Sequence, residues 1–426
     1  MVKGRSSQWF LILFALIFLL PVYSDSFPGL SRKFSFNALI LNVGFDNYAV
    51  IFDAGSTGSR VHVFRFNQDL NLLHVGKDFE LLVTAWPLLQ KAEAAVPKQL
   101  HSKKPLRLGA TAGLRLLDGD EAERILEALF KKESTLEYKA EWVSILEGSE
   151  EGAYLWVAIN YLLGTLGKKY SSTVGVIDLG GGSVQMAYAI AKESAANAPV
   201  AKDAYVLEKN IVGTTYYVYS HSYLNYGLKA ARAQSLKLSG SHGNPCVTNG
   251  YKGTYKYSGV IYNVTAPLSG TSLRRCRALT GEVLKLDAPC PYRNCSFDGV
   301  WNGGGGDGRK NLYVASFFYG TAVGASIIKQ NVPSVKVPPI VYWNAAKVAC
   351  RANVETIKSI FPQIDKRDVP FLCMDLVYEY TLLVHGFGID RLEEMTVLKQ
   401  VEYKGSLVEA AWPLGCAIEV LSSPSA

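Results

Sequence analysis

The chain has 426 residues, of which 49% are hydrophobic and 19% charged, and its formal net charge is +7. This length exceeds what one hydrophobic core organises comfortably, so two lobes are predicted, and the apolar content excludes an intrinsically disordered chain. The basic residues are spread thinly instead of forming runs, which argues against nucleic-acid binding and fits small anionic ligands or simple solubility.

The N-terminus predicts export. Lys3 and Arg5 precede an apolar stretch from Trp9 to Leu20, which is followed by Pro21 and the small-residue site Val22-Tyr23-Ser24. This arrangement is typical of a cleaved signal peptide over residues 1–24. The apolar stretch has 12 residues, fewer than the roughly 18 to 20 that span a bilayer, so a retained membrane anchor is the less favoured alternative. The expected location is extracellular or the lumen of the endomembrane system.

Residues 25–45 show no sustained periodicity and are expected to form a flexible segment, after which a hairpin begins. Tyr48 to Phe52 is a short apolar run that ends at Asp53, and Arg60 to Asn67 alternates like a returning strand. The turn contains Gly55 and Gly58, which let backbone N–H groups face an anion, and it carries polar side chains suited to phosphate: Ser56, Thr57, Ser59 and Arg60. An ordinary glycine-serine hairpin with a solvated Asp53 is the alternative.

The following residues alternate between helix and strand, as an α/β lobe does. Helices are predicted for Leu88–Val96, for a segment that starts near Leu114 and continues over Asp120–Lys132, and for Glu150–Gly164; strands are predicted for Leu106–Gly109 and Val143–Leu146. Thr111 lies where a predicted strand meets a helix, so its hydroxyl is a candidate contact for phosphate or a metal-bound water. A tight packing turn is the alternative there.

The opening pattern then recurs. An apolar run, Val174 to Ile177, ends at Asp178, and a glycine loop leads into a strand over Gln185–Ile190. Asp53 and Asp178 are 125 residues apart, which indicates an ancient duplication with one hairpin at the head of each lobe. Three successive glycines, Gly180 to Gly182, are costly unless something approaches the backbone closely, and Ser183 follows them.

Three acidic residues are candidates for chemistry. Asp53 and Asp178, one at each glycine loop, can hold a hydrated divalent cation, and Ca²⁺ and Mg²⁺ both prefer such hard oxygen ligands. Glu151 lies at a strand-to-helix junction and is the candidate base for activating water. Its neighbour Glu150 is interpreted only as a helix-start acid that complements the helix dipole.

Toward the C-terminus, a helix is predicted around Ser222–Leu238. A second helix is predicted over Leu407–Leu421, despite Pro413, and is expected to pack on the first lobe.

All seven cysteines lie in the second half of the chain, and export favours their oxidation. The pairing preferred from proximity in sequence is Cys246 with Cys276, Cys290 with Cys295, and Cys350 with Cys373, although spacing does not prove connectivity. Cys416 is then left as a buried inert thiol. Asn263 and Asn294 begin glycosylation sequons.

Other enzyme classes are excluded by missing motifs. The chain has no Gly-x-x-x-x-Gly-Lys-Ser/Thr loop, its six histidines show no metal-ligand spacing, and Ser183 does not lie in a Gly-x-Ser-x-Gly elbow.

The segments around Asp53, Thr111, Glu151 and Asp178 occur in an order that resembles the first four signature regions of the apyrase family, the nucleoside triphosphate diphosphohydrolases. Trp301–Gly308 with Val314–Tyr319 resembles the family's nucleotide-side region, and Trp412–Gly415 resembles its last one. In detail the chain is similar to the legume branch of plant apyrases, some of which are described as lectins. The resemblance implies an α/β, two-lobed, actin-like and ribonuclease H-like fold with mixed sheets flanked by helices. Lobe I would comprise residues 46–147 plus 408–426, and lobe II residues 148–407.

The resemblance also implies stepwise release of phosphate from nucleoside tri- and diphosphates with Ca²⁺ or Mg²⁺, without a covalent intermediate. Glu151 would be the base, and Asp53 and Asp178 would hold the metal through its waters. Thr111 would lie near the metal, and Phe318 and Tyr319 are candidates for stacking the base, with core packing as their alternative. The phosphate cradle would consist of Ser56, Thr57, Gly58, Arg60, Gly180, Gly181, Gly182, Ser183 and Gln185.

Two other functions remain open: a lectin-like receptor for oligosaccharides with reduced catalysis, and a sugar kinase or polyphosphate phosphatase on the same scaffold. Two departures from the family pattern stand out. The chain passes abruptly through Val83–Pro87 where relatives carry a further segment containing Pro-Gly-Leu-Ser, and Cys416 occupies a position where a small residue such as serine is expected.

Overall fold

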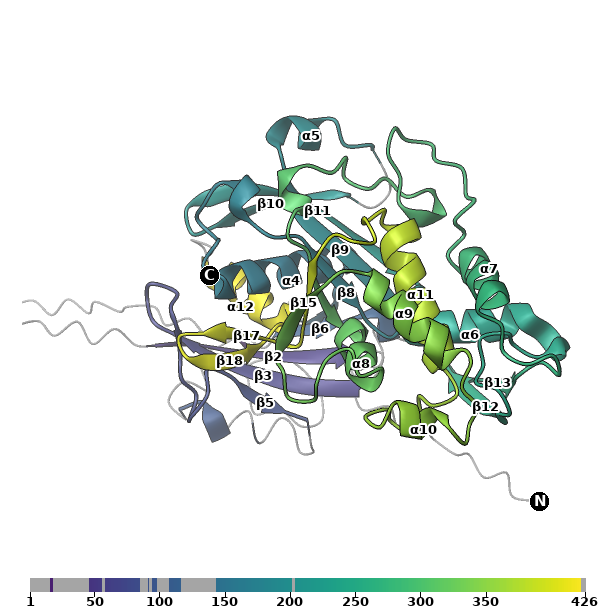
Figure 1. The fold of residues 1–426 in the computed structure, drawn as a ribbon. Coiled ribbons are helices and arrows are strands. Elements are labelled where there is room, and N and C mark those ends of the chain that lie inside the picture. The colour runs from purple at the N-terminus through teal and green to yellow at the C-terminus, as the bar shows by residue number, and fades with distance from the viewer. Residues whose placement is uncertain are drawn as a thin grey trace, which may run out of the picture.

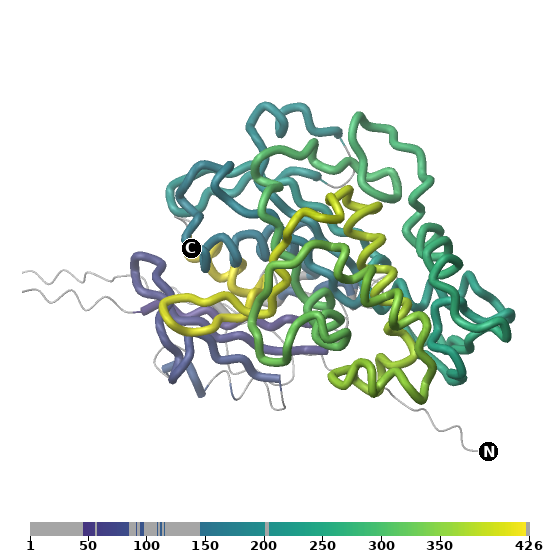
Figure 2. The backbone as a smooth tube through the Cα atoms, viewed as in Figure 1, coloured from purple at the N-terminus to yellow at the C-terminus, as the bar shows by residue number. Residues whose placement is uncertain are grey.

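The computed structural model describes residues 16–17, 46–55, 58–84, 91, 94–97, 107–115, 143–200 and 204–422 (Figures 1 and 2). The helix predicted over Asp120–Lys132 lies outside the described residues, as does most of Leu88–Val96. Of the expected signal peptide and flexible segment, only Leu16–Ile17 is described, as a short strand β1 that pairs with β2.

The first sheet is built on the predicted hairpin. β2 (Asn47–Gly55) and β3 (Gly58–Phe66) pair antiparallel along their whole length, and β6 (Arg107–Ala110) runs parallel to β2 on its other side. Gly58 has φ +153°, a conformation that residues with side chains rarely adopt, and it closes the turn opposite Gly55. The other strands of this sheet are β4 (Leu72–Leu73), β5 (Leu81–Val83) and β7 (Val143–Ile145).

The second sheet repeats this arrangement. β8 (Val176–Leu179) has antiparallel β9 (Ser183–Ile190) on one side and parallel β14 (Tyr313–Ser316) on the other, just as β2 lies between β3 and β6. The predicted duplication is therefore visible in the topology. The remaining strands are β10 (Val206–Ile211), β11 (Thr214–Leu224), β15 (Ser334–Val337) and β16 (Met395–Leu398).

Two helices pack together and join the two sheets in one core. α4 (Gly148–Leu162) and α12 (Trp412–Ser422) pack against each other (Figure 1). Side chains from both sheets join them in one buried cluster that includes Ile51, Trp156 and Ala187. Gly415 permits this contact, because a Cβ there would lie 1.8 Å from the carbonyl oxygen of Tyr154. The fold is the two-lobed, actin-like type with mixed sheets and flanking helices. The division into residues 46–147 plus 408–426 and 148–407 stays a prediction.

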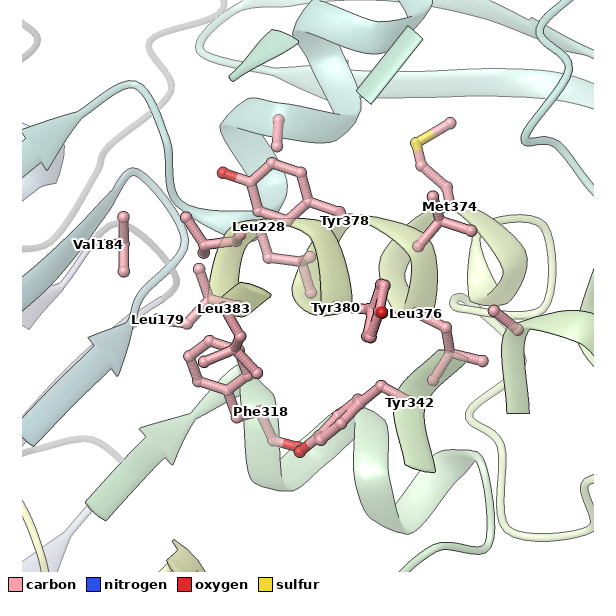
Figure 3. Close-up of a cluster of buried hydrophobic side chains, with 14 of the residues drawn as sticks. Leu179, Val184, Leu228, Phe318, Tyr342, Met374, Leu376, Tyr378, Tyr380 and Leu383 are labelled. Carbon is pink, nitrogen blue, oxygen red and sulfur yellow. The ribbon is translucent and has the colours of Figure 1, made fainter. Parts of the chain in front are cut away.

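A second core lies on the other face of the second sheet, where Ile177 and Met186 alternate with Val176 and Ala187 of the first cluster. Phe318, Tyr342 and Leu383 face one another beside α11 in this cluster (Figure 3). The helices around it and elsewhere are α2 (Ala112–Arg115), α5 (Lys192–Ala196), α6 (Leu228–Ser239), α7 (Leu273–Val283), α8 (Phe317–Gly324), α9 (Ile340–Ala349), α10 (Ile357–Ile360) and α11 (Leu372–Thr381). α11 continues into a π-helical turn, Leu382–Gly386, and short 3₁₀ helices lie at Tyr170–Ser172, Gly240–His242, Phe297–Gly299 and Asp307–Arg309.

Two predicted helices begin later than expected. Ser222 belongs to β11, whose residues pair with β9, so the helix predicted from Ser222 starts at Leu228. The apolar stretch from Leu407 begins as strand β18 (Ser406–Glu409), which pairs with β17 (Gln400–Tyr403), and only then becomes α12. Pro413 is tolerated because it lies in the first turn of α12, where the missing N–H has no intrahelical partner to lose.

The structure contains the disulfides Cys246–Cys276, Cys290–Cys295 and Cys350–Cys373, the pairing preferred from the sequence. Cys416 is buried and outside these bridges. Both sequon asparagines are exposed: Asn263 lies in β13 (Val260–Thr265), which pairs with β12 (Lys252–Tyr257), and Asn294 precedes bridged Cys295. None of the helices that the structure describes is long and apolar enough to cross a membrane.

Candidate active site

The tips of the two repeated hairpins face a common cleft of about 420 Å³. Asp53 and Asp178, the acids at the two tips, both line it, and so does Glu151 from the first turn of α4. The three candidate acids of the sequence are thus brought together by elements that lie far apart in the chain. The rest of the lining is Gly55, Arg60, Thr111, Ala112, Gly180, Gly181, Gly182, Ser183, Ser316, Phe317, Tyr319, Gly320, Leu398, Lys399, Glu409, Ala410, Ala411 and Trp412.

Asp178 carries a buried carboxylate oxygen that is available to a ligand. Its Oδ1 has no hydrogen-bond partner among the described residues, while the side chain accepts a hydrogen bond from Ser316. Burial raises the pKa of Asp178 and the negative charge of Asp53 adds to this, whereas Ser316 and Arg60 act in the opposite direction. A carboxylate oxygen without a protein partner, in the same cleft as a second acid, suits a hard divalent cation. Asp178 and Asp53 therefore fit Ca²⁺ or Mg²⁺.

Glu151 has the environment of a general base. The side chain is buried, and its Oε2 accepts hydrogen bonds from Arg115 Nη2 and from Gln185 Nε2, the latter at 3.2 Å. Burial raises the pKa of Glu151 to about 7; Arg115 lowers it, and Asp178 and Asp53 raise it. A carboxylate with a pKa near neutrality accepts a proton most effectively at physiological pH.

Two positions next to Glu151 were not recognised as functional from the sequence. Ser222 Oγ accepts a hydrogen bond from Arg115 Nη1 at 3.2 Å and lies 2.9 Å from Gln185 Nε2, so it joins the two residues that hold Glu151. Arg115 could have been identified from the sequence, because it lies at the end of the segment recognised around Thr111. Ser222 offered none, because its place beside Gln185 depends on the pairing of β11 with β9.

The second glycine loop is held from behind by α6. The carbonyl groups of Gly180 and Gly181 accept hydrogen bonds from the backbone N–H groups of Leu228 and Ala230 at 2.9 and 3.0 Å. Gly227 allows this contact, because a Cβ there would lie 2.4 Å from the carbonyl carbon of Gly181. With these carbonyls engaged by the protein, the loop is suited to present amide groups to an anion.

The remaining predicted phosphate contacts lie in different surroundings. Gln185, itself fully buried, reaches Ser183 Oγ at 2.6 Å, so these two cradle residues form one network with Glu151. Thr111 lines the cleft while its backbone N–H and hydroxyl both bond the carbonyl of Ala54, at 3.2 and 3.3 Å. Arg60 lines the cleft beside Asp53. Ser56 and Thr57 lie outside the described residues.

The structure corrects the nucleotide side of the site. Phe318 is fully buried, packs edge-on against Tyr342 in the core shown in Figure 3, and does not line the cleft. The aromatic residues that do line it are Phe317 and Tyr319 of α8 and Trp412 of α12. Phe317, the first residue of α8, directly follows Ser316, whose φ is +62°, and lines the cleft in place of Phe318. Trp301 likewise packs on Tyr219 in the core instead of facing the cleft.

The family model described as the GDA1/CD39 (nucleoside phosphatase) family matches residues 43–426, a range that includes every described residue except Leu16–Ile17. The chain belongs to the GDA1/CD39 family. Membership does not by itself assign a role to any single residue.

Several relatives are similar over almost their full length. The chain is 50% identical to the apyrase of Solanum tuberosum, with 99% of this chain and 97% of the relative covered, and 45% identical to a nucleoside-triphosphatase of Pisum sativum, with 97% and 96% covered. The alignment to the potato protein spans 443 positions, more than the 426 residues of this chain, so the relative carries residues that this chain lacks. Among solved structures, the nucleoside triphosphate hydrolases of Neospora caninum are similar in fold, with a TM-score of 0.55 at 15% identity and 88% of this chain and 92% of that chain covered.

Proposed function

We propose that this GDA1/CD39 enzyme hydrolyses the terminal phosphoric anhydride bond of nucleoside tri- and diphosphates, converting ATP to ADP and ADP to AMP. The family and the potato and pea relatives support the reaction class. The observation that carries the residue roles is that the buried carboxylate of Glu151 lines the same cleft as Asp53 and Asp178.

The reaction requires one proton transfer by the protein. Glu151 accepts a proton from a water molecule, the water oxygen forms a bond to the terminal phosphorus, and the bond from that phosphorus to the leaving nucleotide oxygen breaks. Arg115 and Gln185 fix the position of the Glu151 carboxylate, and the amides of the two glycine loops bind the phosphate oxygens. No group of the protein forms a covalent bond to phosphorus.

Asp53 and Asp178 are the residues that would hold the divalent cation on which the enzymes of this family depend. When bound, the cation supplies positive charge that neutralises the phosphate chain and the developing charge on the leaving group. Ca²⁺ and Mg²⁺ both fit oxygen ligands and retained waters, so either is proposed as the natural ion.

The proposal also includes export of the chain and glycosylation at Asn263 and Asn294. The N-terminal sequence and the disulfides support export, and the exposure of both asparagines supports glycosylation.

The test is phosphate release by the purified chain. ATP and ADP are expected to yield phosphate with Ca²⁺ or Mg²⁺, and neither is expected to do so in excess chelator. AMP should not be hydrolysed, because it has no anhydride bond. Turnover of AMP, or binding of oligosaccharides by a protein without ATP and ADP turnover, would contradict the proposal.

Arg115 gives a prediction for the pH profile. In Arg115→Met the pKa of Glu151 should rise, since Arg115 lowers it; the acidic limb of kcat/KM then moves to higher pH, and activity at pH 7 falls on the order of tenfold. Arg115→Lys retains the charge and is the matched control, in which the acidic limb should move less. A uniform loss at every pH, with the limb unmoved, would show that Arg115 does not act through Glu151.

Phe317 gives a prediction for nucleotide recognition. Phe317→Ala should raise KM for ATP by about 3- to 10-fold, because a stacked aromatic contact contributes about 0.5 to 1.5 kcal/mol. The inhibition constant of inorganic tripolyphosphate, which has no base, should not change. Phe318→Leu is the control. It should lower the melting temperature but leave unchanged the ratio of the KM for ATP to the inhibition constant of tripolyphosphate. Equal effects on both ligands in Phe317→Ala would remove Phe317 from the base site.

A further inference from the structure

A largely buried group of charged side chains, His62, Glu80 and Glu409, adjoins the first hairpin, and Glu409 also lines the cleft. His62 follows Arg60 by two residues on β3, is fully buried, and bonds Glu80 through its Nδ1. One donor atom from each of His62, Glu80 and Glu409 lies within 4.8 Å of the others. Glu80 precedes β5, whereas Glu409 ends β18, so the group joins segments more than 300 residues apart.

Arg60 connects this group to the cleft. Its Nε lies 3.6 Å from Asp53 Oδ2, and its Nη1 lies 3.7 Å from Glu409 Oε1. Both separations are ion-pair contacts slightly longer than a hydrogen bond. The guanidinium group is therefore shared almost evenly between Asp53 and Glu409, two carboxylates that both line the cleft.

This sharing has a consequence for Asp53. Arginine presents five N–H donors and binds a single carboxylate in a bidentate manner when nothing else attracts it. Bidentate binding to Asp53 would occupy both of its oxygens, which the proposed function reserves for the waters of the cation. Glu409, which contacts another nitrogen of the guanidinium group, opposes a rotation of Arg60 into bidentate contact with Asp53.

His62 and Glu80 in turn hold Glu409. Burial alone would lower the pKa of His62, but Glu80 and Glu409, the two neighbouring carboxylates, raise it above its ordinary value. The side chain of Glu409 is 18% exposed, and that of Glu80 is 8% exposed. In so confined a place a charged partner restricts where the Glu409 carboxylate can lie.

We infer that Glu409 is a positioning residue for the cation site: backed by His62 and Glu80, it shares Arg60 with Asp53 and so keeps Asp53 available to the cation. The inference rests on the proposed role of Asp53. A cation bound within the His62, Glu80 and Glu409 group is the competing explanation. The Arg60 guanidinium next to Glu409 disfavours it by repulsion, and the His62–Glu80 hydrogen bond already occupies one donor pair.

The test measures cation binding without catalysis. Tb³⁺ bound in the cleft can be excited through Trp412, which lines it, and displaced by Ca²⁺, with no nucleotide present. In Glu409→Gln the half-saturating Tb³⁺ and Ca²⁺ concentrations should rise about tenfold, because Arg60 turns fully to Asp53. At saturating cation, kcat should stay within about twofold, because Glu151 and its partners are untouched. Glu402→Gln, an exposed acid on β17 of the same hairpin, is the matched control and should bind as the wild type does.

A second variant separates positioning from a structural role. Adding Arg60→Met to Glu409→Gln should bring the cation concentration back toward the wild-type value, since no guanidinium group is left to capture Asp53. Glu409→Asp, which retains the charge, should lie between wild type and Glu409→Gln. Unchanged binding in Glu409→Gln, or no recovery in the double variant, would overturn the inference. Loss of one of two bound cations per chain would overturn it in favour of a metal in the buried group. Either result leaves the proposed function intact if the wild type still hydrolyses ATP and ADP and Glu151→Gln does not.

Discussion

Glu151→Gln is expected to lower kcat for ATP and ADP by about 10²- to 10⁴-fold, the range typical of losing a positioned general base. Glutamine has nearly the same shape, and its carbonyl oxygen can still accept the hydrogen bonds that Arg115 and Gln185 donate to Glu151. It cannot take a proton from water. KM and cation binding should therefore change little, and the protein should remain folded.

Glu150→Gln is the matched control for this experiment. Glu150 lies one position earlier in the first turn of α4, is only half-buried and does not line the cleft. Its variant should retain nearly full activity. The assignment of the base would be wrong if Glu151→Gln retained more than about a tenth of the wild-type kcat, or if Glu150→Gln lost as much activity.

Asp178→Asn is expected to give the second large effect, a fall in kcat/KM of about 10²- to 10³-fold with a rise in the half-saturating cation concentration. The asparagine amide provides one neutral oxygen in place of a buried carboxylate. Because Asp178 raises the pKa of Glu151, its loss should also move the acidic limb of the pH profile to lower pH. This direction is opposite to that expected for Arg115→Met, so the two variants can be distinguished in one set of profiles.

The same variant should be more stable than the wild type without metal. The pKa of Asp178 is raised in the folded protein, so the fold binds that proton more tightly than the unfolded chain does. Stability is then lost as pH rises through the raised pKa, and the charge that Asp178 acquires over that range is a cost that asparagine removes. Thermal unfolding should show a higher melting temperature in chelator and no further increase with Ca²⁺.

Asp307→Asn is the control for Asp178→Asn. Asp307 is exposed and pairs with Lys310 at the surface, 2.7 Å away. Neither the pH profile nor the cation dependence should change in this variant. If Asp178→Asn left cation dependence intact, another group would have to hold the metal, and the paired-hairpin account would fail at that point.

The hairpins and their acids were predictable because their determinants are local. An apolar run that ends at Asp53 or Asp178 and is followed by glycines specifies a strand, a turn and a carboxylate at the tip, and the recurrence of the pattern indicates that two such tips meet. Glu151 was predictable for the same reason, since it starts a helix directly after a strand.

The supporting contacts were not predictable, because they join segments that the sequence does not relate. Arg115 and Ser222 are 107 residues apart, and their contact depends on how β11 lies beside β9. Arg60 and Glu409 meet only because the β17–β18 hairpin lies over the first sheet. The choice between Phe317 and Phe318 depends on how α8 lies against the second core and the cleft, which the sequence of two adjacent phenylalanines does not specify.

The stereochemical course of phosphate release tests the central claim most directly. ATP made chiral at its terminal phosphorus with oxygen isotopes and one sulfur would be hydrolysed in isotopically labelled water, and the configuration of the released thiophosphate determined. Attack by a water that Glu151 deprotonates is a single displacement, so inversion of configuration is predicted. Retention would show that a group of the protein is first phosphorylated, and would contradict the account.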